Sequence, residues 1–307
     1  MQTKTERLKR NFSIERKMNL MGWVFVAPSL LVIAFIVLYP IGYTLVLSLC
    51  SKDLLNPENG TRFVGLANFR HLFGDPIYLK ALGNNIFLTV ASVALQLVLG
   101  MMLALLLNKK FFGRAALRGI SILPWAMPTF VASFVWMWMM NPQHGTVNIF
   151  LKNTGLVDKG IPFFTSSKLA IFSMLIPYVW KGLPWVVMVL LSGLQMVQLD
   201  QQEAARIDGA NRWQEFWHVV VPNIYNVILV VILLRTIWTF NWFEYLYLIT
   251  GGGPLDTTMT WPIQVYNLAF KSYRVGRASA LGVLIFLVMI VFSAVYFKVL
   301  GREEDEL

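Results

Sequence analysis

Long apolar segments alternate with shorter polar ones along most of the chain. Six of these runs reach the roughly 20 predominantly apolar residues that a membrane-spanning helix needs. They lie at about 22–49, 84–107, 119–140, 169–191, 223–250 and 279–300. A bilayer admits only helices and closed barrels, so the pattern predicts an all-α, polytopic membrane protein with six transmembrane helices.

Prolines or charges interrupt three of the predicted spans. The interrupting residues are Pro124 and Pro128 in the third run, Pro177, Lys181 and Pro184 in the fourth, and Arg235 and Glu244 in the fifth. Freed backbone groups at such breaks must find protein or water partners, because lipid offers none. Broken spans of this kind therefore indicate a pathway through the membrane.

Three of the interrupting residues are ionisable, and an intramembrane charge is a functional hypothesis by default. Arg235 and Glu244 are nine residues apart, which places them on opposite faces of one helix at about 100° per residue. We therefore favour an interhelical pair such as Lys181 with Glu244, which predicts that Glu244→Gln disturbs assembly more than substrate choice. The alternative is that Lys181 or Arg235 attracts an anionic substrate.

Composition supports membrane residence. The chain is 57% hydrophobic with a mean hydropathy of +0.60, which is more apolar than a soluble domain, and its charged share of 14% is lower than a soluble domain carries. Most side chains must therefore contact lipid or other spans. The net charge of +10 suits anionic lipid. A nucleic-acid-binding arm is excluded because the basic N-terminal tail runs straight into a span without interleaved aromatic residues.

Lysine and arginine positions predict the orientation by the positive-inside rule. Basic residues gather in the tail (Lys4, Arg7, Lys9, Arg10, Arg16 and Lys17) and in the second connection (Lys109, Lys110, Arg114 and Arg118). We expect a cytoplasmic basic tail at 1–21, a transmembrane domain at 22–300 and a cytoplasmic acidic tail at 301–307. Both termini and the loop 199–222 then lie in the cytoplasm of a bacterium, and the chain resides in its inner membrane.

The loop 199–222 contains two predicted helical pieces. Asp200 can cap the first, in which Glu203, Ala204 and Ala205 occupy the first turn, where a carboxylate suits the positive end of the helix dipole. Gly209 is a natural C-terminal breaker. The alanines leave a smooth surface that another protein can approach closely.

The second piece carries an apolar stripe. Trp213, Phe216, Trp217 and Val220 follow the spacing i, i+3, i+4 and i+7, which suits a helix in the lipid headgroup region. Pro222 is expected to interrupt this helix.

Motifs for chemistry are missing from the sequence. No G-x-x-x-x-G-K-[ST] phosphate loop occurs, so the chain is not expected to bind and split ATP. His71, His144 and His218 have no metal-ligand spacing between them, so no metal site is predicted. We expect a transport subunit without catalytic residues and without a cofactor of its own.

The loop resembles that of permease subunits in ABC importers that use a solute-binding protein. Glu203-Ala204-Ala205, Gly209 six residues after the glutamate and Pro222 thirteen after the glycine carry the resemblance. Val219 and Val221 stand where the family has Ile and Leu. The resemblance implies a type I importer permease fold and a coupling helix that docks on an ATPase subunit. The coupling residues it implies are Glu203, Ala204, Ala205, Asp208, Gly209 and Pro222.

Further segments resemble the carbohydrate-uptake branch of these permeases, and its MalF-like subunits most. They are Leu38-Tyr39-Pro40, Phe63-Val64-Gly65-Leu66 with Asn68-Phe69, Leu123-Pro124-Trp125, Trp180-Lys181-Gly182 and Leu248-Ile249-Thr250-Gly251-Gly252-Gly253-Pro254. The branch implies a heterodimer with a MalG-like permease, an external solute-binding protein, a sugar, and an ATP-binding subunit dimer that holds ATP and magnesium. Alternating access then moves the sugar.

Aromatic and polar residues in the broken spans are candidates for sugar contact. In the fourth span, Tyr178, Gly182 and Trp185 share one helical face. In the fifth, Trp238, Trp242 and Tyr245 are also expected to share a face, with Thr239 and Asn241 nearby. Their placement relative to the loop makes Tyr178, Gly182, Trp185, Arg235, Thr239 and Trp242 similar to sugar-contacting positions of the maltose member. The alternative is that these aromatic residues only pack between spans.

Other functions stay open at the level of sequence. An importer of the same class could carry a phosphorylated polyol. A stand-alone secondary transporter would need no ATPase, and the loop around Glu203 would then have no purpose. A membrane receptor or scaffold would gain nothing from polar spans.

Overall fold

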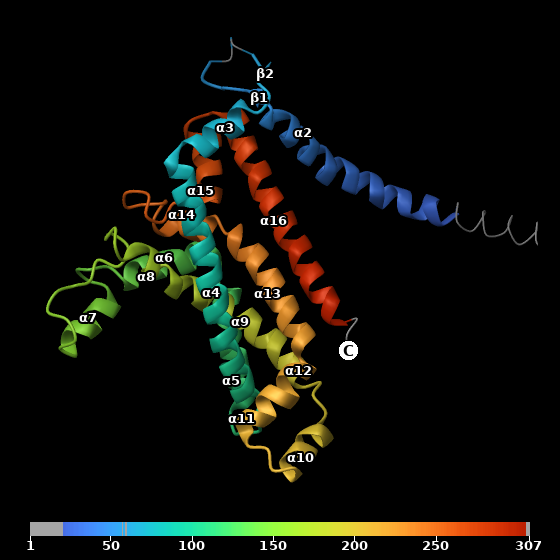
Figure 1. The fold of residues 1–307 in the computed structure, drawn as a ribbon. Coiled ribbons are helices and arrows are strands. Elements are labelled where there is room, and N and C mark those ends of the chain that lie inside the picture. The colour runs from blue at the N-terminus through green and yellow to red at the C-terminus, as the bar shows by residue number, and fades with distance from the viewer. Residues whose placement is uncertain (1–20, 57, 59, 305–307) are drawn as a thin grey trace, which may run out of the picture.

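Long helices form the body of the molecule, which a computed structural model describes over residues 21–56, 58 and 60–304 (Figure 1). The basic tail up to residue 20 and the side chains of the acidic tail lie outside the described residues. The expectation of an all-α protein is confirmed, apart from one pair of very short strands.

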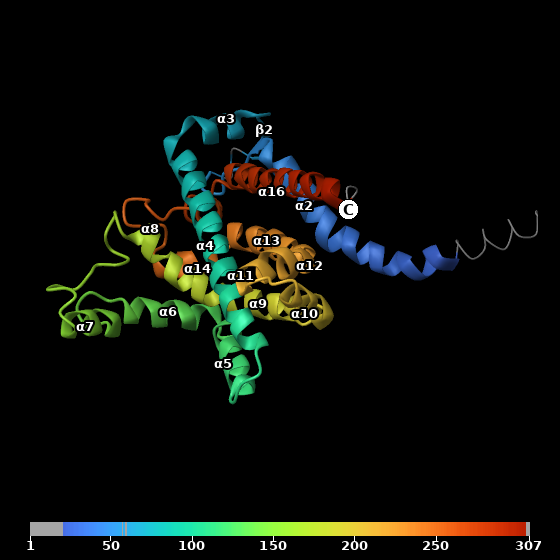
Figure 2. The same cartoon turned by 60° about the horizontal axis from the view of Figure 1, so that its bottom comes forward.

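The first helix extends away from the remaining bundle in both Figure 1 and Figure 2. It is continuous over Met21–Ser48 and includes the π turn η1 (Ala34–Leu38) and α2 (Tyr39–Ser48). Pro40 is the second residue of α2, just after the π turn, and the wider turn accommodates a residue that donates no backbone hydrogen bond. Only the C-terminal end of α2 is buried, at Leu47 and Ser48, and α2 packs against the last helix.

A two-stranded hairpin and a short helix close the upper end of the molecule in Figure 1. The strands β1 (Cys50–Ser51) and β2 (Arg62–Phe63) are antiparallel, with Cys50 opposite Phe63. The helix α3 (Ala67–Gly74) follows. Asn68 fixes this end, because its Nδ2 donates to the carbonyl oxygens of Ser48 at 2.8 Å and Cys50 at 2.9 Å.

The longest helix, α4 (Pro76–Asn108), crosses the molecule from the upper to the lower end. Asp75 caps its start by accepting a hydrogen bond from the Ile77 N–H at 3.0 Å, as N-cap carboxylates do. Its buried face packs on α9 (Leu175–Leu194). The two helices approach closely at Gly100, where an added Cβ would lie 2.7 Å from Val186 Cγ1.

The third predicted span, 119–140, is a bent pair of helices. The helix α5 (Arg114–Ala126) and the helix α6 (Thr129–Met139) meet at 96°. Pro128 stands at the bend and cannot donate the next helical hydrogen bond. The helices α7 (Thr146–Asn153) and α8 (Ala170–Ser173) follow.

The fourth predicted span, 169–191, is less interrupted than the sequence suggested. One helix, α9, continues through Pro177 and Pro184 to Leu194. Pro177 lies in the first turn, where a missing N–H costs no helical bond. The expectation that prolines break this span is therefore wrong, and only the turn at Met174 separates α9 from α8.

The lower end of the molecule is built by short helices. These are α10 (Leu199–Ile207), α11 (Arg212–Glu215), the π turn η3 (Phe216–Val220) and α12 (Val221–Asn223). A bend of 70° then leads into α13 (Tyr225–Phe240). The remaining elements are α14 (Glu244–Ile249), α15 (Trp261–Tyr266), the π turn η4 (Asn267–Lys271) and α16 (Val275–Glu304).

The fifth predicted span, 223–250, is interrupted, because α13 ends at Phe240 and α14 begins at Glu244. Within the described residues, four helices are long and apolar enough to cross a membrane, and counting each bent pair as one span gives six. The four are Met21–Ser48, Pro76–Asn108, Ala170–Leu194 and Val275–Lys298, and the bent pairs are Arg114–Ala126 with Thr129–Met139 and Arg212–Asn223 with Tyr225–Phe240.

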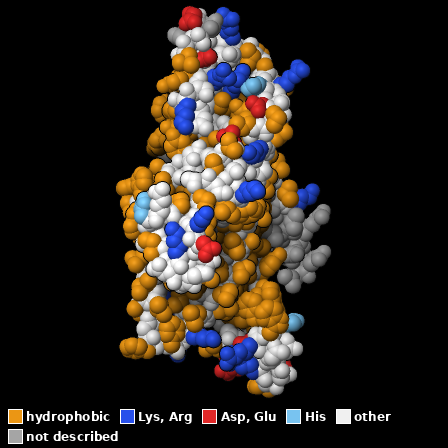
Figure 3. Space-filling model, turned by 90° about the vertical axis from the view of Figure 1, so that its left-hand side faces the viewer, with side chains coloured by type: hydrophobic (Ala, Val, Ile, Leu, Met, Phe, Trp, Pro, Cys, Tyr) orange, Lys and Arg blue, Asp and Glu red, His pale blue; other side chains and the backbone are white. Residues whose placement is uncertain are grey.

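The buried apolar residues form two clusters along the bundle. One surrounds Tyr178, Tyr245 and Trp261 in the upper half, and the other joins α4, α9 and the start of α13 around Leu190 and Ile224. On the face in Figure 3, hydrophobic side chains predominate between charged groups at the upper end, the middle and the lower end. Such a surface suits contact with lipid or with other membrane helices.

Candidate functional site

The helix α10 is the outermost element at the lower end of the molecule (Figure 1). Glu203 and Ala204 are exposed on it, and Ala205 is half-buried. Two large apolar side chains at its ends are also exposed, Leu199 by 70% and Ile207 by 86%. A short helix that presents apolar side chains to the outside in this way is suited to docking on another protein.

An ion pair braces α10 against α11. Arg206 Nε donates to Glu215 Oε2 at 2.9 Å, and Arg206 Nη2 donates to Glu215 Oε1 at 2.7 Å. This two-point geometry is the strongest form of an arginine–carboxylate pair. Glu215 is buried, and the hydrogen bond from Arg206 holds the pKa of its carboxyl below the usual value of 4.5.

The turn after α10 requires a glycine. Gly209 has φ of +88°, in the left-handed region that glycine adopts without strain. The Ala210 N–H then donates to the Ala205 carbonyl at 2.9 Å and satisfies the end of α10. The prediction that Gly209 ends the helix is confirmed, but the prediction that Asp200 caps its start is wrong. Asp200 lies inside the first turn, after the N-cap Gln198.

The second helical piece starts at a capping box formed by Asn211 and Gln214. Trp213 and Trp217 are exposed as the apolar stripe predicts, whereas Val220 is buried. The expected interruption near Pro222 is present but falls slightly later, because the helix continues through the π turn η3 to Asn223 and the 70° bend follows.

The two pieces of the loop are also joined at their far ends. Asn223 Nδ2 donates to Gln201 Oε1 at 2.9 Å and to the Val219 carbonyl at 2.8 Å. Between the pieces is a hollow of about 320 Å³, whose lining includes Asp208, Gly209 and His218. The helix α10 is therefore connected to α11 near one end and to α12 near the other. Of the predicted coupling residues, Glu203, Ala204, Asp208, Gly209 and Pro222 are exposed.

Three of the predicted sugar-contact residues form one aromatic cluster. The Trp242 ring stacks on Tyr245 at 5.0 Å and 13°, and its centroid is 4.7 Å from that of Tyr178. Tyr178 Oη donates to the Trp242 carbonyl at 3.2 Å. The cluster joins α9 to the break between α13 and α14.

A polar chain of contacts lies beside this cluster. Arg235 Nε donates to Gln96 Oε1 at 2.8 Å, and Gln96 Nε2 donates to the Tyr178 carbonyl at 3.0 Å. Arg235 Nη2 is 3.4 Å from Thr239 Oγ1. Gly182 allows this approach, because an added Cβ would lie 2.2 Å from Arg235 Nη2. Sequence reasoning missed Gln96, although a lone glutamine within the apolar run 84–107 was a usable signal.

The remaining predicted contacts are arranged differently from expectation. Trp238 packs edge-on against Trp185 at 4.9 Å, so it does not join Trp242 and Tyr245 on one face. The break after Phe240 separates them. Asn241 is exposed, and its Nδ2 donates to the Ile237 carbonyl at 2.8 Å.

Lys181 contacts the end of α5. Its Nζ donates to the carbonyl oxygens of Pro124 at 3.0 Å and Trp125 at 3.3 Å, and also to that of Met127. The helical partner of the Pro124 carbonyl would be the N–H of Pro128, which does not exist. Lys181 therefore supplies the donors that the bend removes, and a cation suits this negative end of the helix.

The predicted pair of Lys181 with Glu244 does not form. Among the described residues the one salt bridge joins Arg206 and Glu215. Glu244 is exposed at the start of α14, beside the aromatic cluster. Also within the described part of the chain, no group of three or more His, Cys, Asp or Glu residues could hold a metal ion.

Comparison with known proteins shows the family to which this chain belongs. Residues 96–303 match the family described as the binding-protein-dependent transport system inner membrane component. The trehalose transport system permease protein SugA of Mycobacterium tuberculosis is 33% identical over 282 residues, which cover 92% of this chain and 89% of that protein. The trehalose/maltose transport system permease protein MalF of Thermococcus litoralis is 33% identical over 285 residues, covering 92% and 94%.

A third relative and a solved structure are also similar to this chain. The sulfoquinovosyl glycerol transport system permease protein SmoG of Agrobacterium fabrum is 30% identical over 289 residues, covering 93% of this chain and 92% of that protein. A solved bacterial ABC transporter involved in the import of the acidic polysaccharide alginate shares the fold, with a TM-score of 0.81, 21% identity and coverage of 95% and 99%. The chain therefore belongs to the inner membrane components of binding-protein-dependent transport systems, the multi-pass permeases of ABC importers.

Proposed function

We propose that this chain is one of two permease subunits of an ATP-driven, binding-protein-dependent sugar importer, with α10 as the helix that receives the force of ATP hydrolysis. The observation that carries this proposal is the exposure of Leu199, Glu203 and Ile207 on a helix that is braced from behind by Arg206 and Glu215. A docking helix needs an accessible contact face and a rigid connection to the membrane, and α10 has both.

The proposed partner at α10 is an ATP-binding subunit, which would hold ATP and magnesium. Closure of two such subunits would move α10 as a rigid body. The ion pair passes this movement to α11, and the hydrogen bond between Gln201 and Asn223 passes it to α12, which precedes α13. Small displacements at one site are amplified in this way when packed elements move as units.

The proposed sugar path runs along the region where α9 faces α13 and the break before α14. Aromatic faces and polar groups occur together there, at Tyr178, Trp242, Arg235 and Thr239. The names of the relatives favour a sugar, since they include trehalose and trehalose/maltose permeases. In this proposal the chain has no catalytic residue and contributes only binding and movement.

A second permease and an external binding protein complete the proposed assembly. The helix Met21–Ser48 leaves most of its apolar side chains exposed, which a second permease and lipid together would cover. The loop with α10 and the connection with Arg114 and Arg118 lie at the same end of the bundle. The positive-inside rule makes this end cytoplasmic, together with both termini.

The test changes exposed residues of α10 and leaves the ion pair of Arg206 with Glu215 intact. In the proposal, Glu203→Lys and Ile207→Ser each weaken recovery of the ATPase subunit with the complex and lower ATPase stimulation by binding protein and sugar. The control is Asp158→Lys, which alters an exposed acidic residue in the loop after α7. Equal ATPase recovery and stimulation in all variants would contradict the assignment of α10.

A further inference from the structure

Side chains from other helices stabilise the break between α13 and α14. The Phe240 carbonyl, at the end of α13, accepts a hydrogen bond from Asn85 Nδ2 at 3.0 Å. The Trp242 carbonyl accepts one from Tyr178 Oη at 3.2 Å. Two other helices thus satisfy the backbone groups that the break exposes, as a break within a membrane requires.

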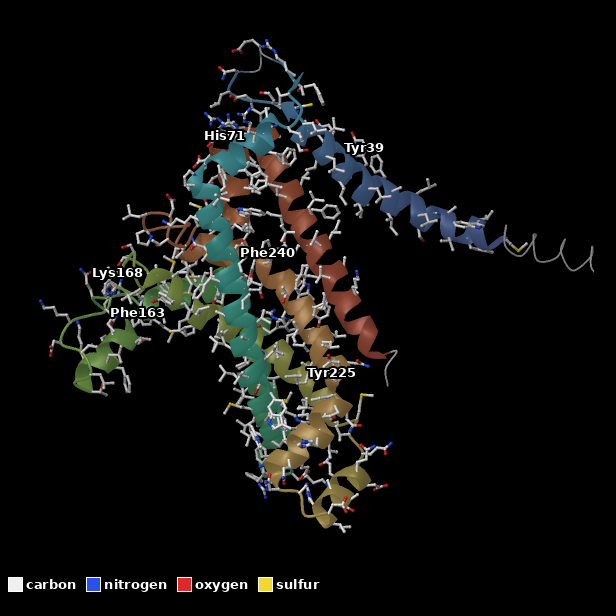
Figure 4. The ribbon with its side chains drawn as sticks, in the orientation of Figure 1. Tyr39, His71, Phe163, Lys168, Tyr225 and Phe240 are labelled. Carbon is white, nitrogen blue, oxygen red and sulfur yellow. The ribbon has the colours of Figure 1, made fainter. Side chains whose placement is uncertain are left out.

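This break lies at mid-depth in the bundle. Figure 4 shows Phe240 about midway between His71 near the upper end and Tyr225 at the start of α13. Glu244 begins α14 at the far side of the break and lies within the predicted fifth span, 223–250, which the proposed permease places in the membrane.

Glu244 and Asn241 are exposed, although the adjacent Phe240 and Tyr245 are buried. A carboxylate at this depth is costly in hydrocarbon, so the face that bears Glu244 does not contact lipid. It must face water or another protein chain. Among the described residues Glu244 has no cation at salt-bridge distance.

The two cationic side chains of the broken spans, Arg235 and Lys181, donate hydrogen bonds to groups other than Glu244. Arg235 is only 6% exposed and bonds to Gln96 and Thr239. Lys181 is near enough to attract Glu244 electrostatically, but its ammonium group donates to the end of α5. The freely accessible charge at the break is therefore negative.

An aromatic face adjoins this charge. Trp242 is half-buried and stacks on Tyr245, so its ring is held in a fixed orientation two residues from Glu244. A ring face packs against the apolar side of a sugar, and a carboxylate accepts hydrogen bonds from hydroxyl groups. The same carboxylate repels a second anion, and repulsion is strong where water is scarce.

From this juxtaposition we infer that Glu244 faces the substrate path and is a specificity-determining residue that favours uncharged sugars over acidic ones. The inference rests on the proposed function and deepens it, because it names the substrate class. It opposes an anionic substrate such as a phosphorylated polyol. It also differs from the expectation that Glu244 serves mainly in assembly, which the experiment below tests as well.

The experiment has two steps and uses the complete importer. Uptake into proteoliposomes first ranks a panel of neutral sugars and their uronic acid counterparts. Binding of the best neutral sugar and of its uronic acid is then measured on the purified complex without binding protein, so that only the permeases select. The variants are Glu244→Gln and Glu244→Asp, and Asp158→Asn is the matched control for the loss of one exposed acid.

The expected result is a wild-type preference for the neutral sugar in both steps. Glu244→Gln should raise the affinity for the uronic acid by about tenfold or more relative to the neutral sugar, while Glu244→Asp and Asp158→Asn keep the wild-type ratio. Preferential uptake of acidic sugars by the wild type would overturn the inference. An unchanged ratio in Glu244→Gln would also overturn it.

One further outcome separates substrate contact from subunit contact. If Glu244→Gln loses the second permease during purification, Glu244 pairs with that subunit, and the inference is overturned. A wild-type complex that takes up no sugar in an ATP-dependent manner would instead refute the proposed function itself.

Discussion

Arg206 and Glu215 join α10 to α11 through two parallel hydrogen bonds of 2.9 and 2.7 Å. The pair closes the Gly209 turn, so α10 cannot swing independently of α11. We predict that Glu215→Gln lowers sugar uptake and ATPase stimulation by roughly 5-fold or more, the usual size of an allosteric coupling. Both are measured on the reconstituted complex. Exchange of the two residues, Arg206→Glu with Glu215→Arg, should recover part of the loss, and a double variant as defective as each single one would contradict the brace.

The same pair predicts a pH dependence. The hydrogen bond from Arg206 lowers the pKa of Glu215 in the folded state. Its contribution to stability is therefore complete above the pKa of the unfolded chain and is lost as the pH falls through the lowered folded value. The difference in Tm between wild type and Glu215→Gln should stay constant from about pH 8 to about pH 5 and shrink only at lower pH. A difference that already disappears near neutral pH would contradict this assignment.

Lys181 is predicted to stabilise the bend between α5 and α6. Lys181→Met leaves the carbonyls of Pro124, Trp125 and Met127 without this donor. We expect a destabilisation of about 1–3 kcal/mol, the cost of unsatisfied buried polar groups. Thermal unfolding of the purified complex measures it, with Lys168→Met, an exposed lysine in Figure 4, as the control within about 0.5 kcal/mol of wild type. Equal Tm values for the two variants would remove Lys181 from this role.

Gly182 is predicted to be irreplaceable at the contact between α9 and α13. In Gly182→Ala the new Cβ would lie 2.2 Å from Arg235 Nη2 and 2.5 Å from Gln96 Nε2. Both side chains must move, at a cost of about 1–3 kcal/mol, and sugar uptake should fall. Gly282→Ala is the matched control, because nothing lies within 4 Å of its added Cβ. Wild-type Tm and uptake in Gly182→Ala would show that the Arg235 arrangement is unimportant.

The sequence predicted the spans well because a membrane helix has one dominant requirement, a long apolar run. The helices Met21–Ser48 and Ala170–Leu194 follow the predicted ranges closely. The position of the break in the fifth span, after Phe240, was not predicted, because no proline or glycine marks it. Asn85 and Tyr178, distant in sequence, supply the hydrogen bonds that allow it.

The candidate site could also be predicted only in part, because its contacts join residues that are distant in sequence. The resemblance to the maltose member implied that Tyr178 and Trp242 belong to one site, and their rings are in contact. The pairing of Lys181 with Glu244 was inferred from charge and helical spacing and is absent within the described residues. A cation inside a membrane protein can be satisfied by helix carbonyls as well as by an acid, and sequence does not show which acceptors are near.

The most direct test of the central claim is uptake of a labelled sugar into proteoliposomes that contain the complete complex. ATP is enclosed inside, and the solute-binding protein is added outside. The importer account predicts uptake that requires both ATP and the binding protein and that falls to background with Glu203→Lys. Sugar uptake by this chain without ATP, unaffected by Glu203→Lys, would contradict the account and identify a secondary transporter.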